Sequence, residues 1–406
     1  MFGRRSRSVE IQGSVSKGFE PVQEVFAEHF ARGHQIGASC CVYRDGERVV
    51  DLWGGVRNAD TGKPWEADTM VLIFSATKGL AAMTLALAHS RGLLDYDELV
   101  STYWPEFAQN GKEHITVRQL LAHQAGLFAF DERVDRSVVA DLDRLAAVMA
   151  RQRPAWPPGT RQAYHAITLG FYEGELLRRI DPQHRSLGQF FQDEIATPLR
   201  LDVYIRLPKS IPNDMLATVQ QANPVQLVTR MPFRLLLTAM NPRSPISRGL
   251  LQPNPGANVV FDDETIYARE LEVPSGGGVG SARGIARAYS AFATRGKELG
   301  LRPETLRALM APAIASTHGF YDEAVKGEVQ FSLGFFKPSP PKPFGLPGAF
   351  GSPGAGGCNG FADPERQIAY AYVHNRMGGV LEDARDIALR DALDSVINRT
   401  KQVVVP

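Results

Sequence analysis

An apolar run that ends in a serine and continues as an apolar helix is the feature that most limits how this chain folds. Residues 71–74 are apolar, Ser75 follows them, and Ala, Leu and Met dominate residues 79–88, which predicts a buried helix. Ser75 and Lys78 then lie in its first turn, where side chains three positions apart share a face with Cβ atoms about 5–6 Å apart. An amine at that distance reaches the serine hydroxyl and activates it as a nucleophile.

The spacing Ser-x-x-Lys occurs three times, and only its context separates the copies. The first copy, residues 14–17, lies in a polar leader. The third copy, residues 339–342, lies in a proline-rich run that conflicts with a helical first turn. Only Ser75 opens an apolar helix. This stretch alone also fits a second interpretation, in which Ser75 caps the helix and Lys78 is a solvated side chain.

Charge balance and cysteine spacing exclude several classes of protein. The 406 residues include 45 basic and 44 acidic side chains, so no charge surplus points to nucleic acid or to an anionic membrane. The 3 cysteines and 9 histidines lack the spacings typical of metal ligands, and an odd cysteine count argues against a disulfide framework. We therefore expect no metal, no other cofactor and no nucleic-acid partner. The sequence leaves the oligomeric state open.

The N-terminus and the hydropathy of the chain predict its location. Residues 1–8 are basic, but the polar residues 9–16 follow where a signal peptide has its apolar core. No run approaches the roughly 18 apolar residues of a membrane-spanning segment. We therefore expect a cytoplasmic protein without membrane contact.

Strand patterns lie near both ends of the chain, and helical patterns lie between them. Strands are expected over residues 37–44, 47–53, 327–336 and 366–374. Helices are expected over residues 20–32, 115–123, 137–151, 167–180, 187–199, 282–294, 303–309 and 380–397. An Asp-Gly turn joins the first two strands into a hairpin. This order predicts one sheet assembled from the two chain ends.

We predict two domains from this order of elements. Residues 1–95 and 270–406 form a discontinuous α/β domain that contains the sheet, and residues 96–269 form a helical domain. Within the latter, prolines recur among apolar pieces from residue 208 onward. A long irregular segment with this composition favours a folded flap, which we expect to cover the substrate site.

A lysine that serves as a base must have an unusual pKa. Its reference pKa of about 10.4 keeps the amine protonated at neutral pH, and lowering it by about 3 units costs roughly 4 kcal/mol. Partial burial next to a positive or helix-terminal field provides this shift. A tyrosine can also share the proton, with Lys78 favouring its phenolate, so we expect a coupled pair. The best candidate is Tyr164, which follows a Pro/Gly turn and precedes a predicted helix.

With these motifs, the chain resembles the serine β-lactamase and penicillin-binding-protein superfamily, and more closely its class C-like esterase branch, the family VIII carboxylesterases. The matching stretches are Ser75-Ala-Thr-Lys78, Tyr164-His-Ala166, Leu120–Leu127, Pro274–Arg283 and Phe350–Glu365. They follow the family's order over residues 20–398. The resemblance implies an α/β (α+β) fold in which helices flank an antiparallel sheet, with a helical domain beside it and the active site between them. It also implies that Ser75 forms an acyl-enzyme while Lys78 and Tyr164 move protons.

The resemblance also assigns a glycine-rich segment to the site. It implies that the N–H groups of Ser75 and Ala355 form the oxyanion hole, where loss of one donor costs on the order of 3–4 kcal/mol. Gly354, Gly356 and Gly357 would let the backbone approach the substrate closely. A plain glycine-rich turn before a strand is the alternative interpretation of this segment.

Two departures from the family pattern bear on the substrate. Ala166 stands where β-lactamases usually have an asparagine amide, and Ser352 begins the third motif where the family usually has Lys, His or Trp. A cation for a substrate carboxylate is therefore missing from this position. His165 either contacts the pocket or, because it adjoins Tyr164, points away from it.

These features predict a serine carboxylesterase for small, neutral or apolar esters. Three alternatives stay open: transfer of the acyl group to an alcohol or amine, weak β-lactamase or peptidase activity, and an inactive binding or scaffold protein of the same fold.

Overall fold

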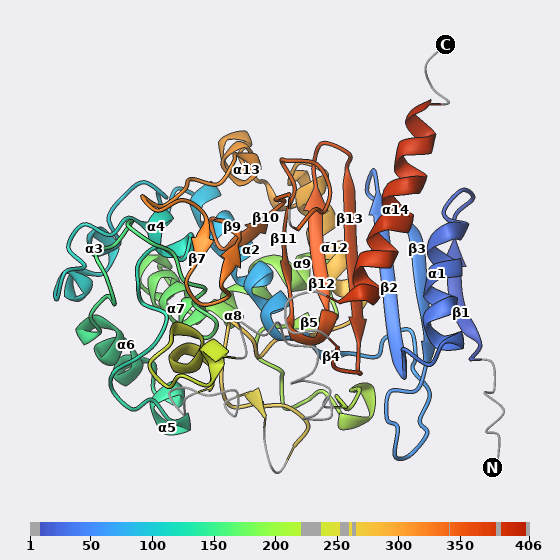
Figure 1. Ribbon diagram of the computed structural model, residues 1–406, viewed down its shortest axis with the longest axis horizontal. Coiled ribbons are helices and arrows are strands. Elements are labelled where there is room, and N and C mark those ends of the chain that lie inside the picture. The colour runs from blue at the N-terminus through green and yellow to red at the C-terminus, as the bar shows by residue number, and fades with distance from the viewer. Residues whose placement is uncertain are drawn as a thin grey trace.

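An antiparallel sheet with strands from both ends of the chain dominates one side of the molecule (Figure 1). The computed structural model describes residues 9–220, 237–251, 260–261, 265–340, 342–378 and 383–402. Within these residues, eight strands lie in the order β1-β3-β2-β13-β12-β11-β10-β9. Their bounds are β1 Ile11–Val15, β2 Gly37–Arg44, β3 Glu47–Gly55, β9 Gln330–Ser332, β10 Phe335–Lys337, β11 Phe350–Pro353, β12 Asn359–Asp363 and β13 Ile368–His374. The predicted fold class is confirmed.

The β2–β3 hairpin follows from its turn residues. Asp45 and Gly46 both have positive φ, 54° and 84°, which matches the twist of the two strands. β1 is absent from the predicted strands because its sequence is polar. It is an edge strand that pairs with β3 and is mostly exposed, so it needs no apolar pattern.

The strand predicted over residues 327–336 is wrong as a single element. The chain forms β8 (Gly327–Glu328), β9 and β10, with a tight turn at Leu333 and Gly334 between the last two. Both turn residues have positive φ, 51° and 87°. The residues on both sides of this turn are apolar, so the hydrophobicity pattern predicts one continuous strand and does not reveal the hairpin.

Helices cover both faces of the sheet. α1 (Glu20–Ala31) and α14 (Ala384–Gln402) pack on one face, and α12 (Ala282–Ala293) packs on the other (Figure 1). The start of the helix predicted over residues 380–397 lies outside the described residues. The sheet is therefore buried on both faces, which explains the continuous apolar pattern of β13.

The helical part lies beside the β9 end of the sheet (Figure 1). It contains α3 Val100–Tyr103, α4 Val117–Leu121, α5 Arg136–Ala140, α6 Leu142–Arg151, α7 Thr168–Ile180, α8 Leu187–Phe191 and α9 Thr197–Leu199. The helix predicted over residues 137–151 is split, because Asp141 is extended and its side chain caps α6. The helix predicted over residues 187–199 is interrupted by a π-helical turn at Gln192–Ala196.

Smaller elements complete the described chain. β4 Val71–Leu72, β5 Val203–Tyr204 and β6 Val279–Gly280 form a second sheet in the order β4-β6-β5, and β7 Tyr321–Asp322 pairs with β8. Two further α-helices are α2 Thr77–Ser90 and α13 Pro303–Met310. No helix among the described residues is long and apolar enough to cross a membrane.

Parts of the predicted flap, residues 221–236, 252–259 and 262–264, lie outside the described residues. Its described parts are tied to the residue that precedes β4, since Ala217 donates its N–H to the carbonyl of Met70 and the Tyr267 hydroxyl donates to the carbonyl of Ala217. The predicted domain boundaries stay a prediction. α2 packs against α7 on one side and against β10 and β11 on the other.

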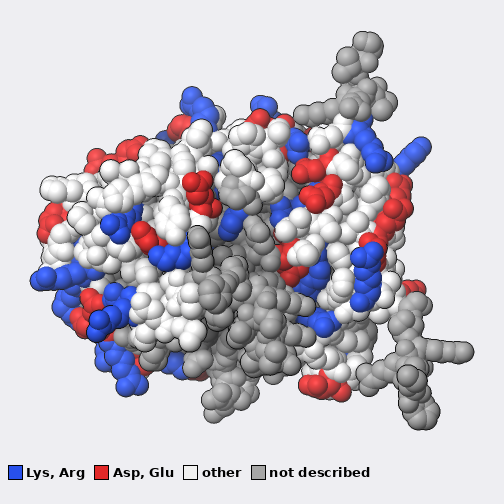
Figure 2. Space-filling view, in the orientation of Figure 1, with Lys and Arg blue, Asp and Glu red and all other residues white. Residues whose placement is uncertain are grey.

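Charged side chains of both signs are intermingled on the face shown in Figure 2. Many charged side chains of the described residues form ion pairs, such as Arg91 with Glu194 at 2.6 Å and Arg178 with Asp143 at 2.8 Å. Exposed pairs of this kind each contribute at most about 1 kcal/mol. The buried core, and not this surface, therefore provides most of the stability.

The packing of Gly79 in α2 gives a test of that core. A Cβ at this position would lie 2.0 Å from the hydroxyl oxygen of the fully buried Tyr289. Alanine gains about 1 kcal/mol of helix propensity, but overpacking costs about 1–3 kcal/mol, so we expect Gly79→Ala to lower the free energy of unfolding by up to about 2 kcal/mol. Urea unfolding followed by circular dichroism measures this change.

Two further variants separate the clash from other effects. Gly327→Ala is the matched control, because a Cβ there meets no atom within 4 Å. Adding Tyr289→Phe to Gly79→Ala removes the obstructing oxygen and is expected to restore part of the loss. A double variant as unstable as Gly79→Ala would contradict the steric explanation.

Candidate active site

The turn that carries Ser75 is held by β11 and by the residue that precedes β6. Ser75 lies in the 3-10 turn η1 (Phe74–Ala76), immediately before α2, and its side chain is half-buried. Phe74 has a φ of 49°, a left-handed conformation that is uncommon for a residue with a side chain. The hydroxyl of Ser352 donates to the Ser75 carbonyl at 2.7 Å, and the N–H of Ile73 donates to the carbonyl of Gly278 at 2.9 Å. These bonds fix the position of the serine.

Lys78 is fully buried, and its amine is aimed at Ser75. Its Nζ donates to the carbonyl oxygens of Ala166 at 2.6 Å and Ser275 at 2.8 Å, and it lies 3.3 Å from Ser75 Oγ. A lysine ammonium has three N–H groups, so these three contacts use its full capacity. Burial lowers the pKa of Lys78 to about 7, while the Glu173 carboxyl acts in the opposite direction. A large fraction of the amine is therefore neutral at physiological pH.

Tyr164 lies against the same pair. Its ring centroid is 4.8 Å from Lys78 Nζ, and it stacks on Phe331 with centroids 5.8 Å apart. Burial raises the pKa of Tyr164 above its usual range, and its side-chain hydrogen bond with Ser75 opposes this only in part. The phenolate expected from the sequence is therefore the wrong resting form. A neutral phenol can still relay a proton, because its oxygen both donates and accepts.

The third motif lies against the nucleophile turn. Ser352 is buried in β11, and its hydroxyl is used by the bond to Ser75, so it positions the serine and does not reach toward a substrate. A Cβ on Gly354 would lie 2.3 Å from the carbonyl oxygen of Ile73, so only glycine fits here. Ala355 follows in the 3-10 turn η8 (Ala355–Gly357), where Gly356 has a φ of 84°. The oxyanion hole at Ser75 and Ala355 stays a prediction, which this proximity favours.

Of the two orientations expected for His165, the structure favours the second, in which the ring is held by backbone groups and does not contact the substrate site. Its Nδ1–H donates to the carbonyl of Ala163 at 2.6 Å, and its Nε2 accepts from the N–H of Leu127 at 3.1 Å. Burial lowers its pKa to about 4, so the ring stays neutral. Both nitrogens thus hold backbone segments, and the proposed substrate contact of His165 is corrected to a structural role.

Three groups near Lys78 are absent from the predicted site. The carbonyl oxygens of Ala166 and Ser275 carry no sequence signal, because any residue supplies a carbonyl. Glu173 on α7 is also buried, and burial raises the pKa of its carboxyl to about 8. A charged residue on an otherwise apolar helix face was the available signal for it. Among the described residues, no three His, Cys, Asp or Glu side chains are grouped to hold a metal ion.

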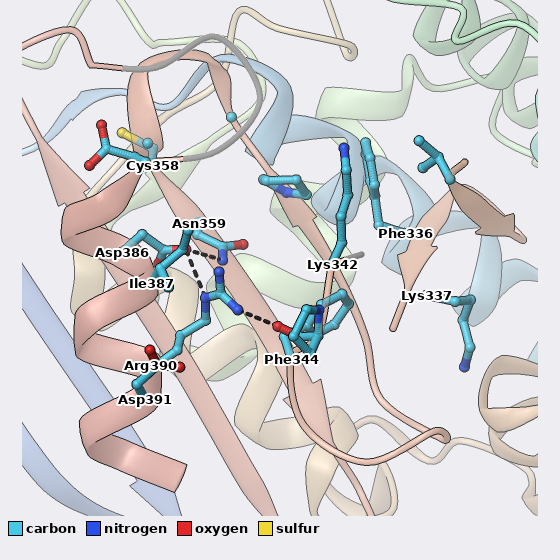
Figure 3. Close-up of a pocket in the computed structure, with 16 residues that line it drawn as sticks. Phe336, Lys337, Lys342, Phe344, Cys358, Asn359, Asp386, Ile387, Arg390 and Asp391 are labelled. Carbon is cyan, nitrogen blue, oxygen red and sulfur yellow. Dashed lines mark hydrogen bonds and ion pairs between the residues drawn. The ribbon is translucent and has the colours of Figure 1, made fainter. Parts of the chain in front are cut away.

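A cavity of about 120 Å³ adjoins the site between β11 and α14 (Figure 3). Phe336, Phe344 and Pro353 form apolar parts of its wall, and Gly354 lines its side nearest to Ser75. Phe336 also packs on Tyr164, with ring centroids 5.7 Å apart. On the wall formed by α14, Arg390 donates to the carboxylate of Asp386, which lies on the same helix. Gly354 and Phe336 thus lie against both the cavity and the residues around Ser75, whereas none of Ser75, Lys78 and Tyr164 lines the cavity.

Comparisons with known proteins agree with this geometry. The model of the family described as Beta-lactamase matches residues 22–394. Among curated proteins, the esterase/beta-lactamase LipL of Mycobacterium tuberculosis is 32% identical over 373 residues, which are 90% of this chain and 83% of that protein.

Two solved structures have a similar backbone over nearly the whole chain. The crystal structure of a family VIII carboxylesterase is 34% identical with a TM-score of 0.82, covering 95% of this chain and 100% of that one. That of a penicillin-binding protein homolog from Caulobacter crescentus is 33% identical with a TM-score of 0.83, again covering 95% and 100%.

Proposed function

The chain belongs to the beta-lactamase family, and on that basis we propose that it is a serine carboxylesterase that cleaves small, neutral or apolar esters through an acyl-enzyme. The single observation that carries this proposal is the buried amine of Lys78. Two carbonyl oxygens hold it, and its remaining contact is with Ser75 Oγ. An amine with a pKa lowered to about 7 can accept the proton of the serine.

The proposed reaction has two similar halves. Ser75 Oγ attacks the ester carbonyl carbon while its proton passes to Lys78, directly or by way of the Tyr164 hydroxyl. The N–H groups of Ser75 and Ala355 stabilise the oxyanion of the tetrahedral intermediate. The intermediate collapses, the C–O bond to the alcohol breaks, and the alcohol takes the proton from Lys78. A water then attacks the acyl carbon and gives its proton to the same amine. The second tetrahedral intermediate collapses, its bond to Ser75 Oγ breaks, and Oγ takes the proton back from Lys78, which releases the acid and restores the serine hydroxyl and the neutral amine.

Two residues support the choice of a neutral substrate. Ser352 replaces a cationic or aromatic residue, and its hydroxyl is bound to Ser75, so it supplies no charge for a carboxylate. Ala166 offers its carbonyl to Lys78 and a methyl side chain in place of an amide. We assign the apolar part of the cavity at Phe336 to one substituent of the ester. The cytoplasmic location stays part of the proposal.

β-Lactam hydrolysis is the second candidate, because the relative LipL is itself described as an esterase/beta-lactamase. A missing charged hydrogen bond costs about 1.5–3 kcal/mol, which is about a 10- to 100-fold loss in kcat/KM for an anionic substrate. We therefore expect short p-nitrophenyl esters to exceed nitrocefin in kcat/KM by at least about tenfold.

The measurement is a panel of p-nitrophenyl esters and nitrocefin at one pH, with products identified by mass spectrometry. A competing alcohol in the same reactions separates acyl transfer from hydrolysis. Nitrocefin turned over as well as the best ester would replace the esterase proposal with a β-lactamase. A panel without any turnover would favour a binding protein.

A further inference from the structure

His123 follows α4 at the point where that helix ends, and its backbone is left-handed. Its φ is 59°, its N–H donates to the carbonyl of Leu120 at 3.1 Å, and the N–H of Gln124 donates to the carbonyl of Gln119 at 2.9 Å. This arrangement is a Schellman motif, in which glycine or asparagine is the usual residue because a larger side chain is strained at positive φ. The end of the helix therefore does not explain a histidine, which is 1% exposed here.

His123 binds both neighbours of Tyr164. The N–H of Ala163 donates to the His123 carbonyl at 3.1 Å, and the N–H of His165 donates to Nδ1 of the His123 ring at 2.9 Å. Burial lowers the pKa of His123 well below its usual range, so the ring is neutral and Nδ1 remains an acceptor. One residue thus holds the backbone immediately before and immediately after the tyrosine.

The ring of His123 also packs against the ring of Tyr164, with centroids 5.1 Å apart. It meets the ring of Phe331 edge-on at 4.3 Å, and Phe331 in turn stacks on Tyr164 at 5.8 Å. All three rings are buried, and each contacts the other two. The phenol ring is therefore held by the same residue that holds the backbone on either side of it.

The position of the Tyr164 hydroxyl decides whether it can carry a proton. The side chain of Tyr164 is hydrogen-bonded to Ser75, and its ring centroid lies 4.8 Å from Lys78 Nζ. A group that transfers a proton works at about 2.6–3.2 Å from its partner, and a misplacement of about 1 Å costs on the order of 10²-fold in rate. Contacts that fix the backbone and ring of Tyr164 therefore bear on the rate of the reaction.

We propose that His123 is a positioning residue that holds Tyr164, through the N–H groups of its neighbours and through its ring, with the hydroxyl directed at Ser75. The inference rests on the proposed function, since it concerns a proton carrier of that reaction. His123 acts through Tyr164 and takes no proton itself. The acceptor at Nδ1 is what glycine, the usual residue at such a helix end, would lack.

The test compares kcat and KM for one p-nitrophenyl ester in the wild-type protein, His123→Leu and His123→Asn. Leucine keeps much of the volume of the ring but has no acceptor. Asparagine tolerates positive φ, and its Oδ1 is attached to Cγ as Nδ1 is in histidine, so it can accept the same N–H. We expect His123→Leu to lower kcat by about 10- to 100-fold with little change in KM, because the lost interaction acts on the transition state. His123→Asn is expected to recover most of that loss.

A second comparison tests whether His123 acts through Tyr164. In the Tyr164→Phe background no hydroxyl remains to be positioned, so adding His123→Leu is expected to cause little further loss of kcat. A double-mutant cycle over the four proteins measures this. Losses that multiply across the cycle would overturn the inference, because His123 would then affect a step that does not involve the Tyr164 hydroxyl.

His29→Leu is the matched control. His29 is also a buried histidine whose ring bonds to a backbone group, the carbonyl of Arg385 at 3.1 Å, but it lies on α1. This variant is expected to lose stability and to keep the wild-type kcat. His123→Gly serves if the leucine variant does not fold, because glycine adopts the positive φ without strain and also lacks the acceptor. Circular dichroism during urea unfolding shows which variants are folded under the assay conditions.

The outcomes are distinguishable. A folded His123→Leu or His123→Gly variant with the wild-type kcat overturns the inference and leaves the esterase intact. An asparagine variant as slow as the leucine variant also overturns it, since the acceptor would then have no effect. A loss of kcat of the same size in His29→Leu would assign the effect to general destabilisation. A wild-type protein that cleaves no ester overturns the proposed function instead.

Discussion

Replacing Ser75 with alanine is expected to lower kcat/KM for every ester by about 10⁴-fold or more, the largest effect of any single substitution. The reason is that the acyl-enzyme has no other oxygen to form on: Ser75 Oγ is the hydroxyl that Lys78 contacts at 3.3 Å. The loss concerns chemistry and not folding, because the bond that anchors the turn uses the backbone carbonyl of Ser75. Steady-state kinetics together with circular dichroism measure both quantities.

Intact-mass spectrometry gives a second, independent readout of Ser75. A quenched reaction with a slow ester, or treatment with a fluorophosphonate, should add mass to the wild-type protein and none to Ser75→Ala. Ser14→Ala is the matched control, since it removes the serine of another Ser-x-x-Lys copy, on the exposed strand β1. An unchanged rate in Ser75→Ala would sink the acyl-enzyme mechanism.

Loss of Lys78 and loss of Tyr164 are expected to be strongly non-additive. We expect Lys78→Met and Tyr164→Phe each to reduce kcat by about 10²- to 10⁴-fold. The kcat of the double variant is expected to lie no more than about tenfold below that of the less active single variant. The physical reason is that both side chains take part in the transfer of the same proton from Ser75. When one of them is removed, the other contributes little to that transfer. Methionine fills the buried space of the lysine, and phenylalanine keeps the stack on Phe331.

A double-mutant cycle on kcat measures the coupling between these residues. Thermal unfolding of all four proteins shows whether each is folded at the assay temperature. Losses that multiply across the cycle would mean that Lys78 and Tyr164 act in separate steps, and the shared-proton mechanism would then be wrong.

The parts of the fold that the sequence predicts well are those that local patterns determine. The Asp45-Gly46 turn marks a hairpin because both positions need positive φ, and α1 follows from an apolar face at helical spacing. β1 and the turn at Leu333-Gly334 are not predictable in this way. The first is a polar edge strand that depends on its partner, and the second is surrounded by apolar residues on both sides.

The site shows the same division. Ser75, Lys78 and Tyr164 carry their chemistry in their side chains, so spacing and context predict them, and the structure brings them together. His165 differs because the direction of a ring next to Tyr164 depends on the backbone groups of Leu127 and Ala163. The two backbone carbonyls that hold Lys78 cannot be predicted from the sequence, because every residue has a carbonyl and no residue type marks these two.

The pairing of β2 with β13 has a consequence for how the protein is made. Residues Gly37–Arg44 leave the ribosome early, yet their neighbour in the sheet, Ile368–His374, is synthesised near the end of translation. The centre of the sheet therefore cannot close during elongation, and pairings between such distant segments form slowly. Until then the apolar strands near the N-terminus are open to wrong partners, so a nascent chain of this protein is expected to depend on chaperones more than the finished fold does.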